Sequence, residues 1–140
     1  MGGTLIIRIL QDNKAVVDSL KEMILQPQSE IGKVREYLVE NGYSIVKENM
    51  VIDDGKYYSM MKAVKGDAKR LEEEELEYGP LLLKEAHPVL KEFLEREIKI
   101  QTQILTSLEE GNSERAMERA GQIRKKIGSI ESVLDKYFER

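Results

Sequence analysis

Few side chains of this sequence could carry out catalysis by themselves. The chain has no cysteine and a single histidine, so neither a thiol nucleophile nor a catalytic triad can be assembled. That histidine, His87, directly precedes Pro88, and we interpret it as a capping or surface residue. No pair of carboxylates has a spacing that predicts a metal site, and no G-x-G-x-x-G or GK[ST] phosphate loop occurs. The sequence therefore predicts no metal.

One short segment could bring a ligand close to the backbone. Gly2 and Gly3 stand directly before a predicted helix, Thr4 to Leu10, whose apolar residues recur at helical spacing. Glycine permits close approach to the backbone, and a helix N-terminus favours negative charge. The alternative is a flexible start of the chain. A second segment, Tyr78 to Glu85, combines a turn with an apolar run and predicts an anchor between two parts of the chain.

The elements that must position these residues are those of an α/β fold. Residues 23–26 are a short apolar run that stops at Pro27, which is the pattern of a buried strand. We expect a helix from Ser29, as its N-cap, to Asn41, with Gly42 in the C′ position.

A hairpin is predicted next. Tyr43 to Ile52 and Lys56 to Val64 are rich in β-branched and aromatic residues, and Asp53-Asp54-Gly55 between them is a strong turn signal. The order of helix, strand, helix and hairpin predicts one edge of a mostly parallel sheet over residues 1–66, with a parallel strand and an antiparallel hairpin. We interpret residues 67–87 as a linker, in which the acidic stretch Leu71 to Leu76 is solvated or helical.

Residues 88–140 follow a helical pattern. Leu90, Leu94, Ile98, Gln101, Leu105 and Leu108 share one side of the first helix, which ends at Gly111. A second helix begins at Asn112-Ser113 and carries Ala116, Ala120, Ile123, Ile127, Ile130, Leu134 and Tyr137 at heptad spacing. The short loop between the two seams predicts an antiparallel coiled-coil hairpin.

Four stretches carry a resemblance to a known family. They are Met1 to Ile6, Leu25-Gln26-Pro27, the hairpin Asp53 to Tyr58, and Gly79 to Glu85. In their order and spacing they resemble the bacterial tRNA (adenine-22-N1)-methyltransferase family, which uses S-adenosylmethionine to methylate a tRNA base. The resemblance implies the C-terminal half of a Rossmann-like methyltransferase domain. It also implies that Gly2, Gly3 and Pro27 lie beside the cofactor or the target base, while the catalytic residues stay unknown.

The resemblance leaves the first three strands of the family's sheet without a counterpart. Those strands supply most of the cofactor contacts in the family. We therefore expect the intact protein to bind S-adenosylmethionine and tRNA, and this chain alone to be inactive. A sheet cut there would expose a strand edge at residues 23–26, which could pair with a second copy in a homodimer. The alternative is a non-enzymatic module that binds a protein partner through its coiled-coil hairpin.

Charge limits how the chain could bind RNA. The net charge of −4 argues against binding by bulk electrostatics. Residues 114–140 are different: they contain seven basic and five acidic residues, so this segment has a net charge of +2. Arg124, Lys125 and Lys126 predict contact with RNA phosphates, and a solvated helix face is the alternative. The chain has no apolar run long enough for a membrane span or a signal peptide, so we expect a cytoplasmic protein.

Overall fold

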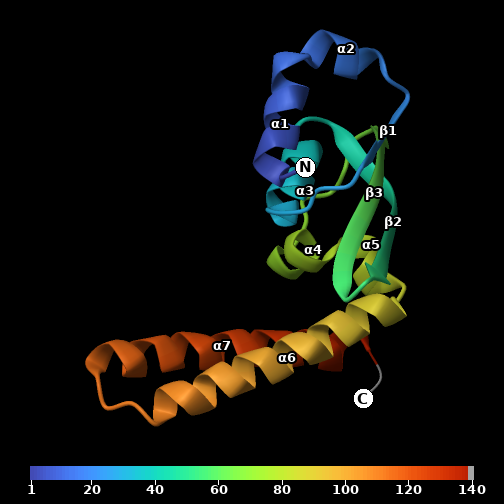
Figure 1. Cartoon of the computed structure of the whole chain (residues 1–140). Helices are drawn as coiled ribbons and strands as arrows, with labels where there is room; N and C mark the ends of the chain where they lie inside the picture. Colours follow the sequence, from blue (N-terminus) through green and yellow to red (C-terminus); the bar gives the residue numbers. More distant parts are fainter. Residues whose placement is uncertain (139–140) are drawn as a thin grey trace. The chain divides into compact units, whose positions relative to one another are not determined.

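The computed structural model describes residues 1–138, which form two compact units (Figure 1). Unit 1 comprises Met1–His87 and contains a sheet with helices. Unit 2 begins at Pro88 and is helical. The boundary coincides with the change from mixed to heptad patterning in the sequence.

The sheet of unit 1 has three strands in the order β1-β3-β2. They are β1 (Glu22–Leu25), β2 (Tyr43–Asp53) and β3 (Lys56–Lys65), and both pairings are antiparallel. The prediction that residues 23–26 form a parallel strand was wrong, because β1 pairs antiparallel with β3, the returning strand of the hairpin. Within residues 1–138, β1 has no parallel neighbour. Its other edge is an edge of the sheet.

The predicted hairpin between β2 and β3 is confirmed. Asp54 and Gly55 have φ angles of 50° and 75°, as a two-residue turn of the type that matches strand twist requires. The register shifts between Ile45 and Lys47, which indicates a bulge in β2.

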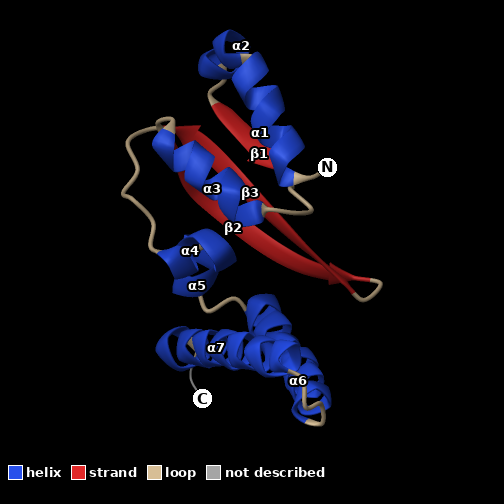
Figure 2. Cartoon of the chain, turned by 90° about the vertical axis from the view of Figure 1, so that its left-hand side faces the viewer, coloured by secondary structure: helices blue, strands red, loops and turns tan. Residues whose placement is uncertain are grey.

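Helices α1 (Gly3–Asp12), α2 (Lys14–Ser19) and α3 (Ile31–Glu40) complete the core. In Figure 2, α1 and α3 lie on the same face of the sheet. Their apolar sides pack with inward-facing residues of the strands, and this core consists of Ile6, Leu10, Val17, Met23, Val34, Leu38, Tyr43, Met61 and Ala63. Gly42 ends α3 with φ 81°, as predicted.

The start of α3 differs from the prediction. Ser29 is not its N-cap: that position is held by Glu30, which has a left-handed backbone conformation and makes no capping bond with its side chain. Helix α3 therefore begins one residue later than predicted, after the left-handed Glu30. The Ser29 carbonyl accepts a hydrogen bond from the Gly3 amide, 2.8 Å away, so the residue before this helix start pairs with the first residues of the chain.

The segment predicted as a linker is folded into unit 1. It contains α4 (Glu73–Tyr78) and α5 (Pro80–Lys84), and α4 packs against α3. A capping box between Glu72 and Glu75 begins α4, so two of the four contiguous glutamates satisfy backbone amides. Leu82 and Leu83 of α5 are buried. The acidic run thus begins a helix, and the apolar run after it anchors α5.

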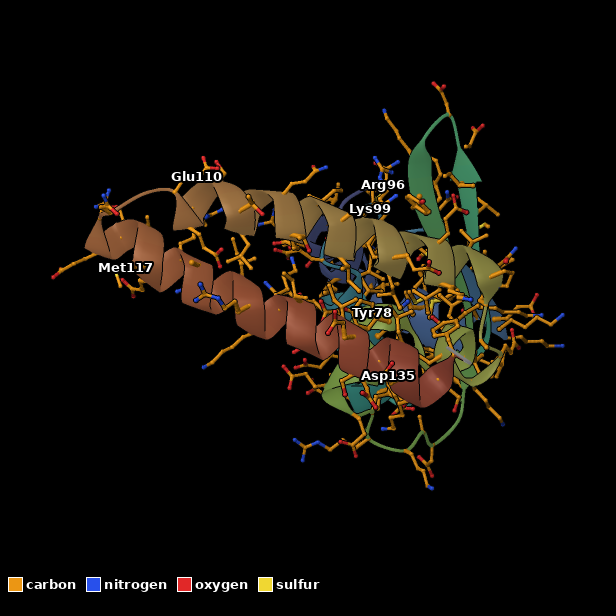
Figure 3. All side chains as sticks on the ribbon, turned by 90° about the horizontal axis from the view of Figure 1, so that it is seen from below. Tyr78, Arg96, Lys99, Glu110, Met117 and Asp135 are labelled. Atoms are coloured by element: carbon orange, nitrogen blue, oxygen red, sulfur yellow. The ribbon has the colours of Figure 1, made fainter. Side chains whose placement is uncertain are left out.

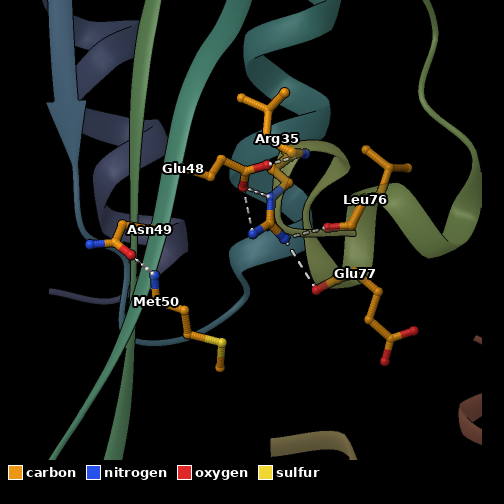
Figure 4. Close-up of polar contacts among 7 residues, drawn as sticks. Arg35, Glu48, Asn49, Met50, Leu76 and Glu77 are labelled. Atoms are coloured by element: carbon orange, nitrogen blue, oxygen red, sulfur yellow. Dashed lines mark hydrogen bonds and ion pairs between the residues drawn. The ribbon is translucent and has the colours of Figure 1, made fainter. Parts of the chain in front are cut away.

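A buried ion pair connects these helices to the sheet (Figure 4). Arg35 of α3 lies with its Nη2 atom 3.0 Å from Oε2 of Glu48 in β2, and both side chains are almost fully buried. Arg35 Nη1 also donates to the carbonyl oxygens of Leu76, at 2.8 Å, and Glu77, at 3.1 Å. Glu48 Oε1 accepts a hydrogen bond from the Leu81 amide at the start of α5. Each charged group is therefore satisfied by several partners, as burial demands.

The electrostatics of the pair reflect its burial. Desolvation lowers the pKa of the Arg35 guanidinium and raises the pKa of the Glu48 carboxyl group. Their mutual attraction acts in the opposite direction on both groups, and the Leu81 amide adds to it at Glu48. The attraction between the two groups thus partly offsets the cost of burying each charge.

Gly79 is the residue that allows this pair to form. Its φ angle is 101°, and a Cβ atom there would lie 2.6 Å from Glu48 Oε2 and 2.9 Å from Arg35 Nη2. Any side chain would enter the space of the ion pair. Gly79-Pro80 therefore both ends α4 and admits the carboxylate to the first turn of α5.

Unit 2 consists of α6 (Pro88–Glu109) and α7 (Glu114–Tyr137), which pack side by side. Figure 3 shows their side chains meeting between the two ribbons. Ser113 is the N-cap of α7 and its hydroxyl accepts a hydrogen bond from the Ala116 amide, which confirms the predicted helix start. Of the predicted seam residues, Leu90, Leu94, Ala120, Ile123, Ile130 and Leu134 are buried. Val133 is also buried, outside the predicted pattern.

Replacing Glu48 should strongly destabilise unit 1. In the Glu48→Ala variant the Arg35 guanidinium is left buried without its counter-ion, and we expect a decrease of about 3 to 5 kcal/mol in the free energy of unfolding. Five of the six tyrosines lie in unit 1, so urea unfolding followed by tyrosine fluorescence measures this decrease. The control is Glu36→Ala on the exposed side of α3, which should change stability by no more than about 0.5 kcal/mol. Equal stability of the two variants would contradict this role of the pair.

Candidate functional site

The first residues of the chain lie against the segment that follows β1. The Gly3 amide donates to the Ser29 carbonyl over 2.8 Å, and the Gln28 amide donates to the Met1 carbonyl over 2.9 Å. Gln28 directly follows Pro27, which lies just beyond the end of β1. The structure therefore brings Gly2, Gly3 and Pro27, the three residues predicted for the cofactor or target base, together just beyond the end of β1.

Packing explains why Gly3, and in part Gly2, is a glycine. A Cβ atom at Gly3 would overlap the Ser29 carbonyl oxygen and lie 2.7 Å from that of Glu30. A Cβ atom at Gly2 would lie 2.9 Å from the Ser29 hydroxyl oxygen. Gly3 and Pro27 are buried, whereas Gly2 is half-buried. The backbone that approaches Gly3 thus belongs to the chain itself, and only Gly2 keeps a surface for a ligand.

Thr4 and Glu30 also meet at this place, although no pattern in the sequence predicts their contact. The Thr4 hydroxyl donates to a carboxylate oxygen of Glu30, and Lys33 Nζ lies 3.3 Å from the same oxygen. The Thr4 hydrogen bond, followed by the contact with Lys33, lowers the pKa of the exposed Glu30 carboxyl group. Glu30 is brought to Thr4 by its left-handed backbone, which a glutamate rarely adopts, so sequence spacing could not reveal the contact.

His87 has a structural contact. Its Nε2 atom lies 2.9 Å from Oδ1 of Asn49 in β2, and the same oxygen accepts a hydrogen bond from the Met50 amide. Asn49 and Met50 appear in Figure 4. This contact connects the end of unit 1 to β2 and agrees with a non-catalytic interpretation of the histidine.

The three residues predicted to contact RNA differ in their surroundings. Arg124 forms an ion pair with Glu109 of α6, with 2.8 Å between Nη2 and Oε1. Lys125 and Lys126 are exposed on α7. The structure therefore places the three residues on the hairpin surface but ties one of them to the neighbouring helix.

We also searched the described residues for a metal site, a groove and a membrane-spanning helix. In residues 1–138, no group of three or more histidine, cysteine or acidic side chains is placed to hold a metal ion. A groove of roughly 940 Å³ lies between α3 and the segment before α4. None of the residues predicted for the cofactor lines it; its walls are Glu36, Val39, Glu40, Ala68, Arg70, Leu71, Glu72, Glu73 and Leu76. No helix within residues 1–138 is long and apolar enough to cross a membrane.

Solved structures define the class of fold. A Streptococcus agalactiae protein of the NADB-Rossmann superfamily is 30% identical to this chain, with a TM-score of 0.79 over 96% of this chain and 56% of that protein. A Streptococcus pneumoniae protein, provisionally assigned as a tRNA (m1A22) methyltransferase and solved in complex with S-adenosyl-L-methionine, is 30% identical with a TM-score of 0.72. It is matched over 96% of this chain and 56% of its own. The chain thus has an α/β fold like part of a Rossmann-like methyltransferase.

The family is also defined. The family model described as tRNA (adenine(22)-N(1))-methyltransferase matches residues 1–132. The Bacillus subtilis (strain 168) tRNA (adenine(22)-N(1))-methyltransferase is 25% identical over 141 residues, which cover 96% of this chain and 59% of that enzyme. The chain belongs to the tRNA (adenine(22)-N(1))-methyltransferase family, and the resemblance seen in its motifs is confirmed. It spans somewhat more than half the length of this relative.

Adding one methyl group at Gly3 should disturb the junction between α1 and residues 28–30. Because the Cβ atom of Gly3→Ala would meet backbone oxygens that cannot rotate away, we expect a lower melting temperature. The matched control is Gly128→Ala in α7, where nothing lies within 4 Å of the new Cβ atom. That substitution should stabilise the helix by up to about 1 kcal/mol. Thermal unfolding followed by circular dichroism compares the two, and a Gly3→Ala variant as stable as the parent would show that the junction is loose.

Proposed function

We propose that this chain contributes the target-base edge and a tRNA-binding hairpin to an S-adenosylmethionine-dependent methyltransferase that modifies N1 of an adenine in tRNA. The observation that carries the proposal is the meeting of Met1–Gly3 with residues 27–30 beyond the end of β1. Ligands of open α/β sheets bind outside the carboxyl ends of the strands. The family match over residues 1–132 supports the reaction.

The residues of this chain offer only part of a cofactor site. S-adenosylmethionine would supply the methyl group. Gly2 would provide exposed backbone beside it, while Gly3 and Pro27, being buried, would hold that backbone in place. The polar groups nearby, Thr4 and Glu30, are already bonded to each other. A complete pocket would therefore need further residues, and this chain spans only 59% of its Bacillus subtilis relative.

We therefore expect that the 140-residue chain does not bind S-adenosylmethionine by itself. Titration calorimetry should give no saturable heat at micromolar concentrations of protein and ligand. The positive control is the Streptococcus pneumoniae relative, which was solved with this ligand and is matched over only 56% of its length. Saturable micromolar binding to the 140-residue chain would mean that the pocket lies within these residues.

The hairpin is proposed to assist tRNA binding through Arg124, Lys125 and Lys126. Each of the three is exposed on α7, and Lys and Arg side chains supply the salt-dependent part of nucleic-acid affinity. The family match reaches residue 132 and so includes most of α7. The segment that carries these charges therefore lies within the family match. A coiled-coil geometry for α6 and α7 belongs to the same proposal.

Replacing Arg124, Lys125 and Lys126 together by glutamine should weaken tRNA binding. The slope of log affinity against log salt should fall by about 0.7 to 0.9 for each phosphate that the variant no longer neutralises, with little change in thermal stability, because the seam is untouched. Fluorescence anisotropy with a folded tRNA at several salt concentrations measures both the affinity and its slope. A control with the same change of charge replaces the exposed Lys14, Lys21 and Lys69 of unit 1 by glutamine. If the α7 triple variant bound as tightly as the parent at every salt concentration, the hairpin would not contact tRNA.

The free edge of β1 is proposed as a surface for pairing with a second copy. Within residues 1–138 it has a partner on only one side, and Ile24 is 73% exposed. Unpaired edges invite strand addition. Light scattering of the chain tests this homodimer, which a clean monomer at high concentration would contradict. A tRNA-modifying role further implies a cytoplasmic protein.

A further inference from the structure

The basic residues of α7 do not form a single cluster around the helix. Successive residues of an α-helix are rotated by about 100°, so Arg115, Arg119 and Lys126 fall within about 40° of one another. Gln122 lies on the same line, between Arg119 and Lys126. All four side chains are exposed. They form a row along one flank of the helix, at positions i, i+4, i+7 and i+11.

Arg124 and Lys125 lie elsewhere on the helix. Arg124 is roughly 160° around the helix from the centre of this row, and Lys125 is roughly 100° away. Arg124 is held on the opposite flank by its ion pair with Glu109 of α6. Among residues 1–138, none of the three cations of the row is in such a pair.

The carboxylates of α7 are also kept away from the row. Each lies roughly 80° or more around the helix from its centre, and they are Glu114, Glu118, Glu131 and Asp135. The flank with Arg115, Arg119 and Lys126 is therefore mainly positive, although the helix as a whole carries both signs. The nearest carboxylate is Glu118, which borders the row three residues after Arg115. Segregated charge of this kind favours an extended anionic partner over isolated surface ion pairs.

We propose that Arg115, Arg119, Gln122 and Lys126 form a track for the phosphate backbone of the substrate RNA, and that Arg124 is not part of it. With a rise of 1.5 Å per residue, the row is about 16 Å long, which spans several phosphates of one strand. The amide of Gln122 can donate to phosphate or ribose oxygens between the charged contacts. This inference rests on the proposed tRNA-binding role of the hairpin and specifies which face of α7 performs it. It revises the residue set proposed above, because of Arg124, Lys125 and Lys126 only Lys126 lies in the track.

Two double variants test the track, because each removes two positive charges from the same helix. Arg115→Gln/Arg119→Gln should lower the slope of log affinity for tRNA against log salt by about 1.4 to 1.8. Arg124→Gln/Lys125→Gln should lower it by less than half as much. The measurement is fluorescence anisotropy with the 140-residue chain and folded tRNA, and circular dichroism verifies that both variants keep their helices.

Other outcomes would overturn the inference in distinguishable ways. Equal decreases in the two variants would mean that binding follows total charge, which removes the track but leaves the hairpin as an RNA-binding element. No decrease in either variant would remove the hairpin's proposed role as well as the track. If polyglutamate bound the chain as strongly as tRNA and with the same sensitivity to Arg115 and Arg119, the surface would fit an acidic protein instead.

Discussion

The buried contact between Arg35 and Glu48 is the constraint on which unit 1 depends. One guanidinium and one carboxylate connect β2, α3, the end of α4 and the first turn of α5. Neither charge could remain buried without the other, so the positions of these four elements are coupled. Gly79 leaves the space that the pair occupies. Within the Gly-Pro-Leu-Leu-Leu run, the glycine is therefore explained by the space that the ion pair occupies, and Leu82 and Leu83 by their burial.

Packing within the chain also explains residues at the proposed functional edge. Gly3 is required because the backbone of residues 29 and 30 fills the place of its side chain, and Pro27 is buried beside them. This packing fixes where the backbone of Gly2 is presented, which gives the edge a defined shape before any ligand binds. The family's motifs at this place thus have a structural role in addition to the role proposed in methyl transfer.

Local signals predicted the parts of the fold that depend on neighbouring residues. Asp53-Asp54-Gly55 specified the hairpin, Gly42 the end of α3, and Ser113 the start of α7, because each of these acts through its own backbone conformation or cap. Interactions between distant segments were missed. The Ser29 carbonyl bonds to Gly3, and the supposed linker folds because Arg35, some 40 residues earlier, binds its carbonyl groups. For the site, the family resemblance implied that Gly2, Gly3 and Pro27 lie at the same edge, and their role there stays a prediction. The sequence contained no indication of Glu30 or of the pairing of Arg124 with Glu109.

The central proposal is that unit 1 contributes a target-base edge and that unit 2 contributes an RNA-binding hairpin. Ultraviolet cross-linking of folded tRNA to the 140-residue chain, followed by mass spectrometry of the linked peptides, tests it most directly. The account predicts cross-links in the part of α7 from Arg115 to Lys126 and near residues 1–3. Cross-links confined to the acidic segment of residues 72–77, or spread evenly over both units, would contradict it.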